Sequence, residues 1–288
     1  MQSPAARNPA RPCPPTDVAV SGSVHGIGSG TVVGMLIGAH MSPVDPLAAA
    51  AARDADLVQM FLSDPQSYRA PEPREDAEAL KASGMPLYVH APYVMNPASA
   101  NNRIRIPSRK TIADTMEAAA AIGASGVIVH GGHVDEDEDV AVGFERWRKL
   151  FEHGGGWDVP LLIENTAGGG NAVAREFANL GPLWEAIGEY NVGVVLDTCH
   201  AWAAGEDLAK AVDVVRDRTG RLDLIHANNS RDPHGSRRDR HANLGKGEIP
   251  EDLLVHCVRS GGDVPLVVET PDDDGGQAAD IAWLRARV

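Results

Sequence analysis

Eight short apolar runs alternate with longer helix-forming stretches along most of this chain. The apolar runs lie near residues 35–39, 56–62, 86–90, 126–130, 159–164, 192–197, 222–227 and 264–269. Stretches rich in Ala, Glu and Arg follow them, near 45–53, 73–83, 108–122, 139–151, 173–188, 206–218, 250–260 and 277–286. Continuous apolar strands are typical of a parallel sheet that is buried on both faces. Eight strands, each followed by a helix, predict a (β/α)8 TIM barrel of class α/β.

Six of these runs end in a side chain that can bind a metal ion. They end in His90, His130, Glu164, Asp197, His226 and Glu269. In a closed barrel the carboxyl ends of the strands converge on one face, where barrel enzymes place their chemistry. We therefore expect these side chains to form one shared site for several metal ions. A doubly wound open sheet is the alternative fold, but it would place a ligand at a single switch point.

Three further ligand-type residues lie just beyond strand ends, namely His200, Asp239 and His241. The spacing Asp-x-His places two side chains on one side of an extended segment, which suits chelation of one ion. The nine candidates are imidazoles and carboxylates without a thiolate, a mixture that suits zinc better than manganese or iron. A single histidine at a strand end is usually structural, so the prediction depends on the whole set.

The remaining histidines and cysteines are expected to be structural. His40, at the end of the first strand, could support a ligand, whereas His133, His153, His234 and His256 carry no such expectation. Cys199 lies between two candidate ligands and is expected to be a buried thiol, with a zinc thiolate as the alternative. With Cys13 and Cys257 it makes neither a disulfide framework nor a Cys-x-x-Cys zinc site, which favours a reducing cytoplasm.

The charge and composition of the chain indicate which kinds of partner it can bind. The formal net charge of −14 argues against a polyanionic partner, but bound divalent ions are not counted in it. Two basic clusters could neutralise phosphates locally. They are Arg103, Arg105, Arg109 and Lys110, and Arg231, Arg237, Arg238 and Arg240. No apolar run approaches the roughly 18 residues of a membrane span, so we expect no membrane association.

The first 34 residues differ from the rest. They are rich in Pro, Gly and Ser, and Gly and Ser interrupt any apolar core that a secretory signal would need. We expect residues 1–34 to be a disordered tail or an over-extended start. Residues 35–288 are then the catalytic barrel, and translation from Met35 would produce it.

The motifs around the candidate ligands resemble endonuclease IV, the zinc-dependent apurinic/apyrimidinic (AP) endonucleases of base excision repair. The resemblance covers the chain from about Met35 to its end. The matching stretches are His90-Ala91-Pro92-Tyr93, Val129-His130-Gly131-Gly132, Glu164-Asn165-Thr166-Ala167-Gly168, Leu196-Asp197-Thr198-Cys199-His200-Ala201, Gly235-Ser236-Arg237-Arg238-Asp239-Arg240-His241 and Leu244-Gly245-Lys246-Gly247.

This resemblance implies three zinc ions per chain. The first ion would bind His90, His130 and Glu164. The second would bind Glu164, Asp197, His226 and Glu269. The third would bind His200, Asp239 and His241. Glu164 and Glu269 would then be catalytic. The implied reaction hydrolyses the phosphodiester 5′ to an abasic site and leaves a 3′-hydroxyl and a 5′-deoxyribose phosphate, with trimming of blocked 3′ ends. We expect a monomer that acts on double-stranded DNA with abasic sites or blocked 3′ ends, in the cytoplasm and, in a prokaryote, associated with the nucleoid.

The resemblance also implies DNA contacts above the same face. Tyr93 matches a family residue that pushes into the DNA, and Arg103, Arg105, Arg237, Arg238 and Arg240 would contact phosphates. Two positions depart from the family. Gln66 stands where the family can place an inserting Arg, with Tyr68 or Arg69 as substitutes. Asn229 stands where an Asp is common, so ligand tuning or phosphate contacts would differ.

Two other functions remain as alternatives. A metal-dependent sugar isomerase or epimerase on the same barrel would hold one or two metal ions and would need a general base near a sugar carbon. A non-catalytic lesion-binding or metal-storage protein would bind DNA tightly without turnover. The Asp239–His241 pair and the neighbouring arginines favour the endonuclease.

Overall fold

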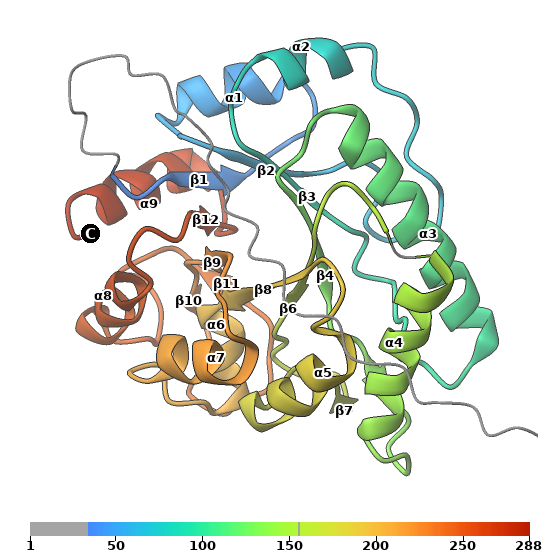
Figure 1. Cartoon of the computed structure of the whole chain (residues 1–288). Helices are drawn as coiled ribbons and strands as arrows, with labels where there is room; N and C mark the ends of the chain where they lie inside the picture. Colours follow the sequence, from blue (N-terminus) through green and yellow to red (C-terminus); the bar gives the residue numbers. More distant parts are fainter. Residues whose placement is uncertain (1–33, 155) are drawn as a thin grey trace, which may run out of the picture. The chain divides into compact units, whose positions relative to one another are not determined.

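The computed structural model describes residues 34–154 and 156–288, and these form a closed barrel of eight parallel strands (Figure 1). The order around the barrel is β1-β12-β9-β8-β6-β4-β3-β2. Pairing of Ile37 with Leu266 joins the first strand to the last, so the predicted barrel is confirmed and the open sheet is wrong. The strands are β1 (Ile37–His40), β2 (Val58–Phe61), β3 (Leu87–His90), β4 (Gly126–His130), β6 (Leu161–Glu164), β8 (Val192–Asp197), β9 (Leu224–His226) and β12 (Leu266–Val268).

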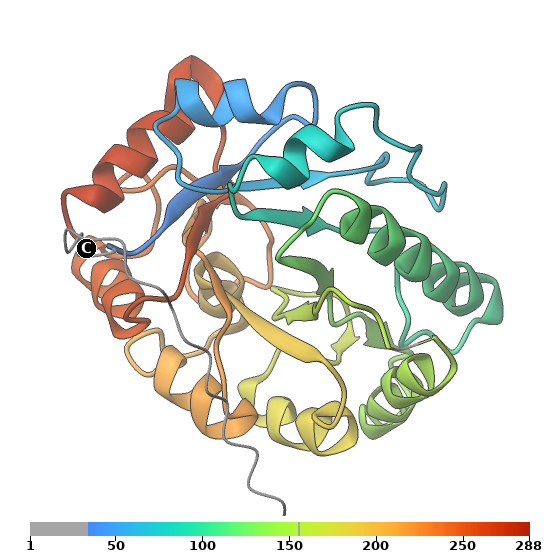
Figure 2. The ribbon, with the colours of Figure 1, turned by 45° about the horizontal axis from the view of Figure 1, so that its top comes forward.

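Helices surround this barrel, as Figure 2 shows. They are α1 (Pro46–Ala52), α2 (Ala77–Ala82), α3 (Asn102–Ala121), α4 (Ala141–Gly154), α5 (Leu180–Ile187), α6 (Thr198–Ala204), α7 (Ala211–Thr219), α8 (Glu251–Ser260) and α9 (Gly276–Arg285). Short elements lie in the loops: β5 (His133–Val134) pairs with β7 (Asn171–Ala172), β10 (Asn229–Ser230) pairs with β11 (His241–Ala242), and η1 (Phe177–Asn179) and η2 (Asp273–Gly275) are 3-10 turns. None of the helices in residues 34–154 and 156–288 is long and apolar enough to cross a membrane.

Several helices differ from the predicted ranges. Helix α5 begins at Leu180 after the turn η1, and not near 173, and α7 begins at Ala211, and not near 206. The third helix was predicted near residues 108–122, but α3 begins at Asn102 and includes Pro107. The side chain of Asn101 accepts a hydrogen bond from Arg103 N, and this N-cap supports the early start despite the proline. Helix α6 was not predicted, because it follows β8 without a turn. Asp197 caps it by accepting a hydrogen bond from His200 N at 2.7 Å.

The interior of the barrel consists of two layers of side chains. The lower layer is apolar and contains Leu36, Leu57, Tyr88, Ile128, Leu162, Val195, Leu224 and Val267. Side chains two residues apart on a strand point to the same face. The position two residues further along each strand therefore forms the next layer toward the carboxyl ends. This upper layer consists of Gly38, Gln59, His90, His130, Glu164, Asp197, His226 and Glu269.

The upper layer is almost entirely polar, and it is the layer that holds the six strand-end candidates. Gly38 is its one position without a side chain. A Cβ atom at Gly38 would lie 2.0 Å from the carbonyl oxygen of Leu57, so no larger residue fits there. The predicted tail, residues 1–34, lies outside the described residues except for Gly34.

Candidate metal centre

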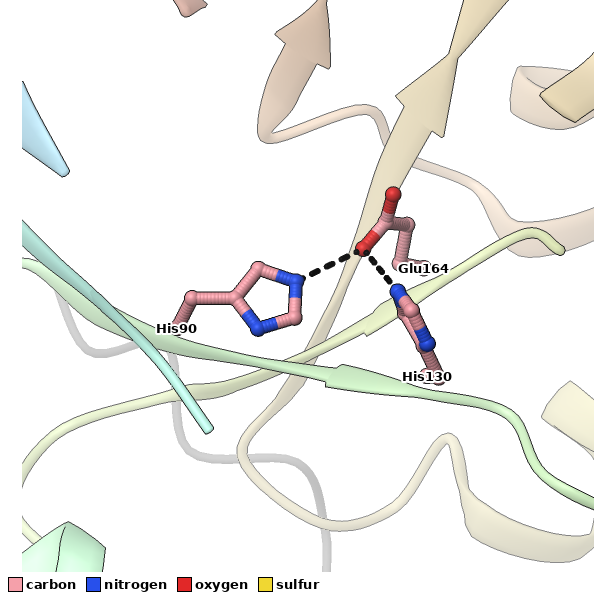
Figure 3. A group of neighbouring side chains, drawn as sticks. All are labelled: His90, His130 and Glu164. Carbon is pink, nitrogen blue, oxygen red and sulfur yellow. Dashed lines mark hydrogen bonds and ion pairs between the residues drawn. The ribbon is translucent and has the colours of Figure 1, made fainter. Parts of the chain in front are cut away.

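Glu164 lies at the centre of the site and is fully buried. Its Oε2 is 3.2 Å from Nε2 of His90 and 3.2 Å from Nε2 of His130 (Figure 3). Its Oε1 is 3.1 Å from Nδ1 of His226 and 3.2 Å from Nδ1 of His200. The barrel register places His130 directly beside Glu164 on the neighbouring strand. The two carboxylate oxygens therefore face two different groups of ligand-type side chains.

The second group contains Glu164, Asp197, His226 and Glu269, whose ligand atoms lie within 4.8 Å of one another. Asp197 and His226 are level across β8 and β9. His226 Nδ1 is 3.2 Å from Glu269 Oε2 and 3.8 Å from Asp197 Oδ2. The strand ends thus bring together residues from four separate parts of the chain.

The third group contains His200, Asp239 and His241, which come from a helix and a loop rather than from barrel strands. Asp239 Oδ1 is 3.1 Å from Nε2 of His200 and 3.2 Å from Nε2 of His241. Pairing of β10 with β11 fixes the position of His241. Asp239 is half-exposed, so this group lies at the open side of the site. All nine predicted ligand-type residues are therefore brought together.

Two buried nitrogens in the third group are unsatisfied. Within the described residues, His200 Nε2 and His241 Nε2 have no hydrogen-bond partner, although each lies close to Asp239. Buried polar atoms are normally paired, so both lone pairs and the carboxylate are arranged for an additional cationic partner. Imidazole nitrogens and carboxylate oxygens are the ligands that zinc accepts. The donor set and the geometry of the three groups fit divalent metal ions.

The electrostatics of these side chains agree with this fit. Burial alone would raise the pKa of the Glu164 carboxyl, but the imidazoles of His226 and His130 hold that pKa well below its ordinary value. Burial alone would lower the pKa of His226, but the carboxylates of Glu269 and Glu164 raise it well above its ordinary value. Protons on imidazole thus balance the carboxylates, and a divalent ion could take their place.

Three buried amides that the sequence did not identify hold the ligands in place. Gln59 Nε2 donates to Glu269 Oε1 at 2.6 Å. Asn228 Nδ2 donates to Asp197 Oδ2 at 2.6 Å, and its Oδ1 accepts from Glu269 N at 2.8 Å. Asn165 Oδ1 accepts from Asp197 N at 2.7 Å. A polar residue inside an apolar strand, as at Gln59, was the available signal. The asparagines follow strand-end ligands and carry no such signal.

The histidines that are not among the nine candidate ligands make other contacts. His40 Nδ1 lies 3.6 Å from Glu269 Oε1 and 2.9 Å from Gln59 Nε2, so it adjoins the second group. His153, His234 and His256 contact backbone carbonyls, away from the three groups. His133 lines a cavity beside the site.

The thiol of Cys199 lies near the site without joining the three main groups. Cys199 is fully buried, and its Sγ lies within 4.8 Å of ligand atoms of Asp197 and His241. Burial raises the pKa of this thiol to about 12. Because the thiolate is the form that binds metal, these surroundings favour the protonated, buried thiol that the sequence predicts.

Two cavities open beside the three groups. One of about 310 Å³ is lined by His130, Thr166, Gly168, Arg237 and Asp239, among others. The other, of about 280 Å³, contains His40, Phe61 and Glu269. Tyr93 borders both cavities, and 46% of its surface is exposed. The site is therefore open to a large substrate on this face, with an aromatic side chain at its rim.

The arginines that are predicted to contact DNA differ in whether a carboxylate of the protein already binds their guanidinium groups. Arg240 donates to Asp232 Oδ2 at 2.7 Å, and Arg238 lies 3.4 Å from Asp232 Oδ1. Arg103 and Arg237 are exposed. Within residues 34–154 and 156–288, the guanidinium group of Arg237 makes no hydrogen bond or ion pair, so it is available to a ligand.

The two departures from the family pattern have different environments. Gln66 is exposed in the loop after β2. Nearby, Tyr68 Oη donates to Val94 O at 2.8 Å, which connects this loop to the one that carries Tyr93. Asn229 is fully buried, and its amide binds both the N–H and the carbonyl of Ile249. Its side chain thus fixes a loop and does not face a substrate.

Comparison with known proteins decides the family. A family model described as the xylose isomerase-like TIM barrel matches residues 47–287. A probable endonuclease 4 from Mycobacterium tuberculosis is 58% identical over 253 residues, which are 88% of this chain and 99% of the relative. A probable endonuclease 4 from Mycobacterium marinum is 56% identical over 254 residues, with the same coverage. The chain belongs to the endonuclease IV family.

Solved structures agree with membership of the endonuclease IV family. Endonuclease IV from Thermus thermophilus is 31% identical, with a TM-score of 0.76 over 87% of this chain and 98% of that one. A D-tagatose 3-epimerase-like protein is 18% identical with a TM-score of 0.67, and this likeness shows the barrel fold alone. The predicted family, fold and enzyme class, a DNA-cleaving hydrolase, are confirmed. Endonuclease IV enzymes depend on metal, and the side-chain groups found here are candidates to hold it.

Proposed function

We propose that this protein is a zinc-dependent AP endonuclease that hydrolyses the phosphodiester 5′ to abasic sites in double-stranded DNA. It leaves a 3′-hydroxyl and a 5′-deoxyribose phosphate, and it also trims blocked 3′ ends. The proposal rests on the position of the Glu164 carboxylate, because its two oxygens face different groups of candidate ligands. This arrangement, with the Asp239 group beside it, suits three ions acting on one phosphodiester.

The three groups described above would each hold one zinc ion. His90 and His130 would share the first with Glu164, and Asp197, His226 and Glu269 would share the second with it. His200, Asp239 and His241 would hold the third. Bound zinc lowers the pKa of water to about 7 and neutralises charge that develops on phosphate oxygens. Glu164 would hold two ions close together, and Glu269 would complete the second set.

The surrounding residues would bind and orient the DNA. Arg237 lines the cavity beside the site, Arg103 is exposed at the start of α3, and Arg238 and Arg240 flank Asp239 in the chain, so all four could neutralise backbone phosphates. Tyr93 at the rim would press against the duplex at the lesion. The adjoining cavity would receive the abasic nucleotide, whose extrusion costs little because it has no stacked base. The protein would act as a monomer, in the cytoplasm and at the nucleoid.

An incision assay tests the proposal. The full chain is loaded with zinc, its ions are counted by elemental analysis, and a duplex with a stable abasic analogue is added. We expect three ions per chain and cleavage on the 5′ side of the analogue with a 3′-hydroxyl end. Glu269→Gln should retain DNA binding and lose cleavage, whereas Glu176→Gln, which changes a half-exposed carboxylate that is not a candidate ligand, should retain both.

The outcome also separates the competing functions. Three bound ions without incision would contradict the endonuclease. One or two ions together with sugar epimerase activity would favour the isomerase or epimerase. Binding of DNA that Glu269→Gln leaves unchanged, without any turnover in either protein, would favour a lesion-binding protein.

A further inference from the structure

We propose that Gln59 is a positioning residue that fixes the ring of His226 with Nδ1 directed at the metal centre. This inference rests on the proposed function, because it concerns the second group of zinc ligands. Gln59 is fully buried in β2 and belongs to the same interior layer as the ligands. Its side chain contacts His226, Glu269 and His40.

The histidines of the site differ in what holds their rings. His90 Nδ1 lies 2.7 Å from the carbonyl oxygen of Ala91, and His200 Nδ1 lies 2.9 Å from that of Asn165. In both rings a backbone carbonyl accepts the Nδ1 proton, so Nε2 is left for the ion. A backbone carbonyl remains whatever the side chain, so the orientation of these two rings does not depend on one replaceable residue.

His226 has the opposite orientation. Its Nδ1 faces the carboxylates of Glu164 and Glu269, at 3.1 and 3.2 Å, and its Nε2 lies 2.8 Å from Gln59 Oε1. The partner of Nε2 is therefore a side chain rather than the backbone. A ligating histidine commonly donates its second N–H to such a partner, which sets the tautomer and the direction of the ring.

The charge on Glu269 determines which way the Gln59 amide points. An ionised carboxylate only accepts hydrogen bonds, so the amide nitrogen must face Glu269 Oε1, 2.6 Å away. The second amide hydrogen points to His40 Nδ1 at 2.9 Å. The amide oxygen then faces His226 and can only accept. His226 must donate from Nε2, which leaves its Nδ1 lone pair for the ion.

Because the site is buried, the orientation of the His226 ring depends on the side chain of Gln59. Gln59 and His226 are both fully buried. Water therefore does not readily replace a hydrogen-bond partner that His226 loses. Replacement by leucine would keep the volume but leave the buried His226 N–H without a partner, and it would remove the donor to Glu269 Oε1. Removing such a supporting residue commonly weakens metal binding by about 10- to 100-fold.

Three variants test the role in the full chain. Gln59→Leu removes the acceptor for His226 and the donor for Glu269. Gln59→Glu retains an acceptor for His226 but loses the donor. Met60→Leu is the matched control, because Met60 is equally buried in the same strand and packs in the hydrophobic core between barrel and helices. Thermal unfolding of the metal-free proteins shows whether each variant is folded.

Two readouts need no DNA. Competition with a zinc-binding dye measures the affinity of each ion, and nitrogen-15 NMR of the imidazoles reports which ring nitrogen of His226 carries the proton in the zinc-loaded protein. We expect Gln59→Leu to bind one of the ions about 10- to 100-fold more weakly and to lose the protected Nε2–H signal. Gln59→Glu should keep that signal, and Met60→Leu should match the parent protein.

The inference is overturned if Gln59→Leu keeps its ion affinities within twofold of the parent, or if its Nε2–H signal persists. It is overturned equally if Gln59→Glu, once shown to be folded, loses the signal that its acceptor should preserve. Failure of the proposed function gives a different result, namely absence of incision by the parent protein with its three ions bound.

Discussion

Asp239 Oδ1 lies 3.1 Å from Nε2 of His200, yet the two residues come from elements outside the barrel strands. His200 is in α6, directly after β8, and Asp239 is in the loop before β11. The other two ligand groups come from the strand ends. The third group therefore depends on loop structure above a barrel that can form without it.

Asp239→Asn should remove the third ion without unfolding the protein. Its side chain is half-exposed, so the fold loses little, while the ion loses its only carboxylate in that group. We expect elemental analysis to fall from three ions to two, and incision to fall by at least about 100-fold, which exceeds the effect of losing a supporting residue. Asp207→Asn, with a similarly exposed carboxylate near Lys210, is the control. Retention of three tightly bound ions by Asp239→Asn would contradict the assignment.

Cys199→Ala should leave the metal content unchanged. The nine candidate ligands form their three groups without the Cys199 thiol, and burial raises the pKa of this thiol to about 12. Cys257→Ala is the matched control, because Cys257 is also buried and burial also raises its pKa to about 12. Each variant should lose about 1 kcal/mol of stability through lost packing, measured by urea unfolding. A zinc thiolate would instead appear as loss of one ion from Cys199→Ala alone.

Arg237→Ala should weaken DNA binding and reduce its dependence on salt. Arg237 is exposed and lines the larger cavity beside the site. A lost phosphate contact should lower the slope of log affinity against log salt concentration by about 1. Fluorescence anisotropy with duplex DNA at several salt concentrations measures it. Arg148→Ala, which changes an ion pair with Glu145 on α4, should leave the slope unaltered. An unaltered slope in both variants would remove Arg237 from the DNA contacts.

The Glu138–Arg146 pair should make part of the stability depend on pH. Hydrogen bonds from Arg146 lower the pKa of Glu138 from 4.5 to about 2. Because the folded-state pKa lies below the unfolded value, this contribution is complete above pH 4.5 and is lost as the pH falls toward 2. The unfolding temperature of chelator-treated protein between pH 6 and pH 3 should therefore fall less in Glu138→Gln than in the parent protein. Equal falls would show that the pair contributes nothing.

The fold was predictable because eight predominantly apolar runs alternate with helix-forming stretches along the chain. Boundaries were less predictable where a side-chain hydrogen bond decides them. Asn101 caps α3 ahead of Pro107, and Asp197 begins α6 without any intervening turn. Such caps depend on the position of one side chain, which composition and periodicity do not reveal. The tail at residues 1–34 stays a prediction.

The candidate ligands were predictable because six imidazoles and carboxylates end strands of one barrel, and the carboxyl ends of those strands meet on a single face. The residues that hold them were harder to find. Asn165 and Asn228 bind Asp197 from adjacent strand ends, and an asparagine after a strand is common in any loop. Gln59 could have been identified by its position two residues beyond Leu57, because that spacing places it in the ligand layer.

The contact between Gln59 and Glu269 joins residues 210 positions apart in the chain. A ribosome releases the amino-terminal part of a protein first, so Gln59 and His226 emerge before Glu269 can reach them. Until β12 has been synthesised, the barrel lacks the strand that pairs with β1, and the second group lacks Glu269. Full metal loading is thus a property of the finished polypeptide, and a prematurely terminated product lacking β12 would be unable to complete the centre.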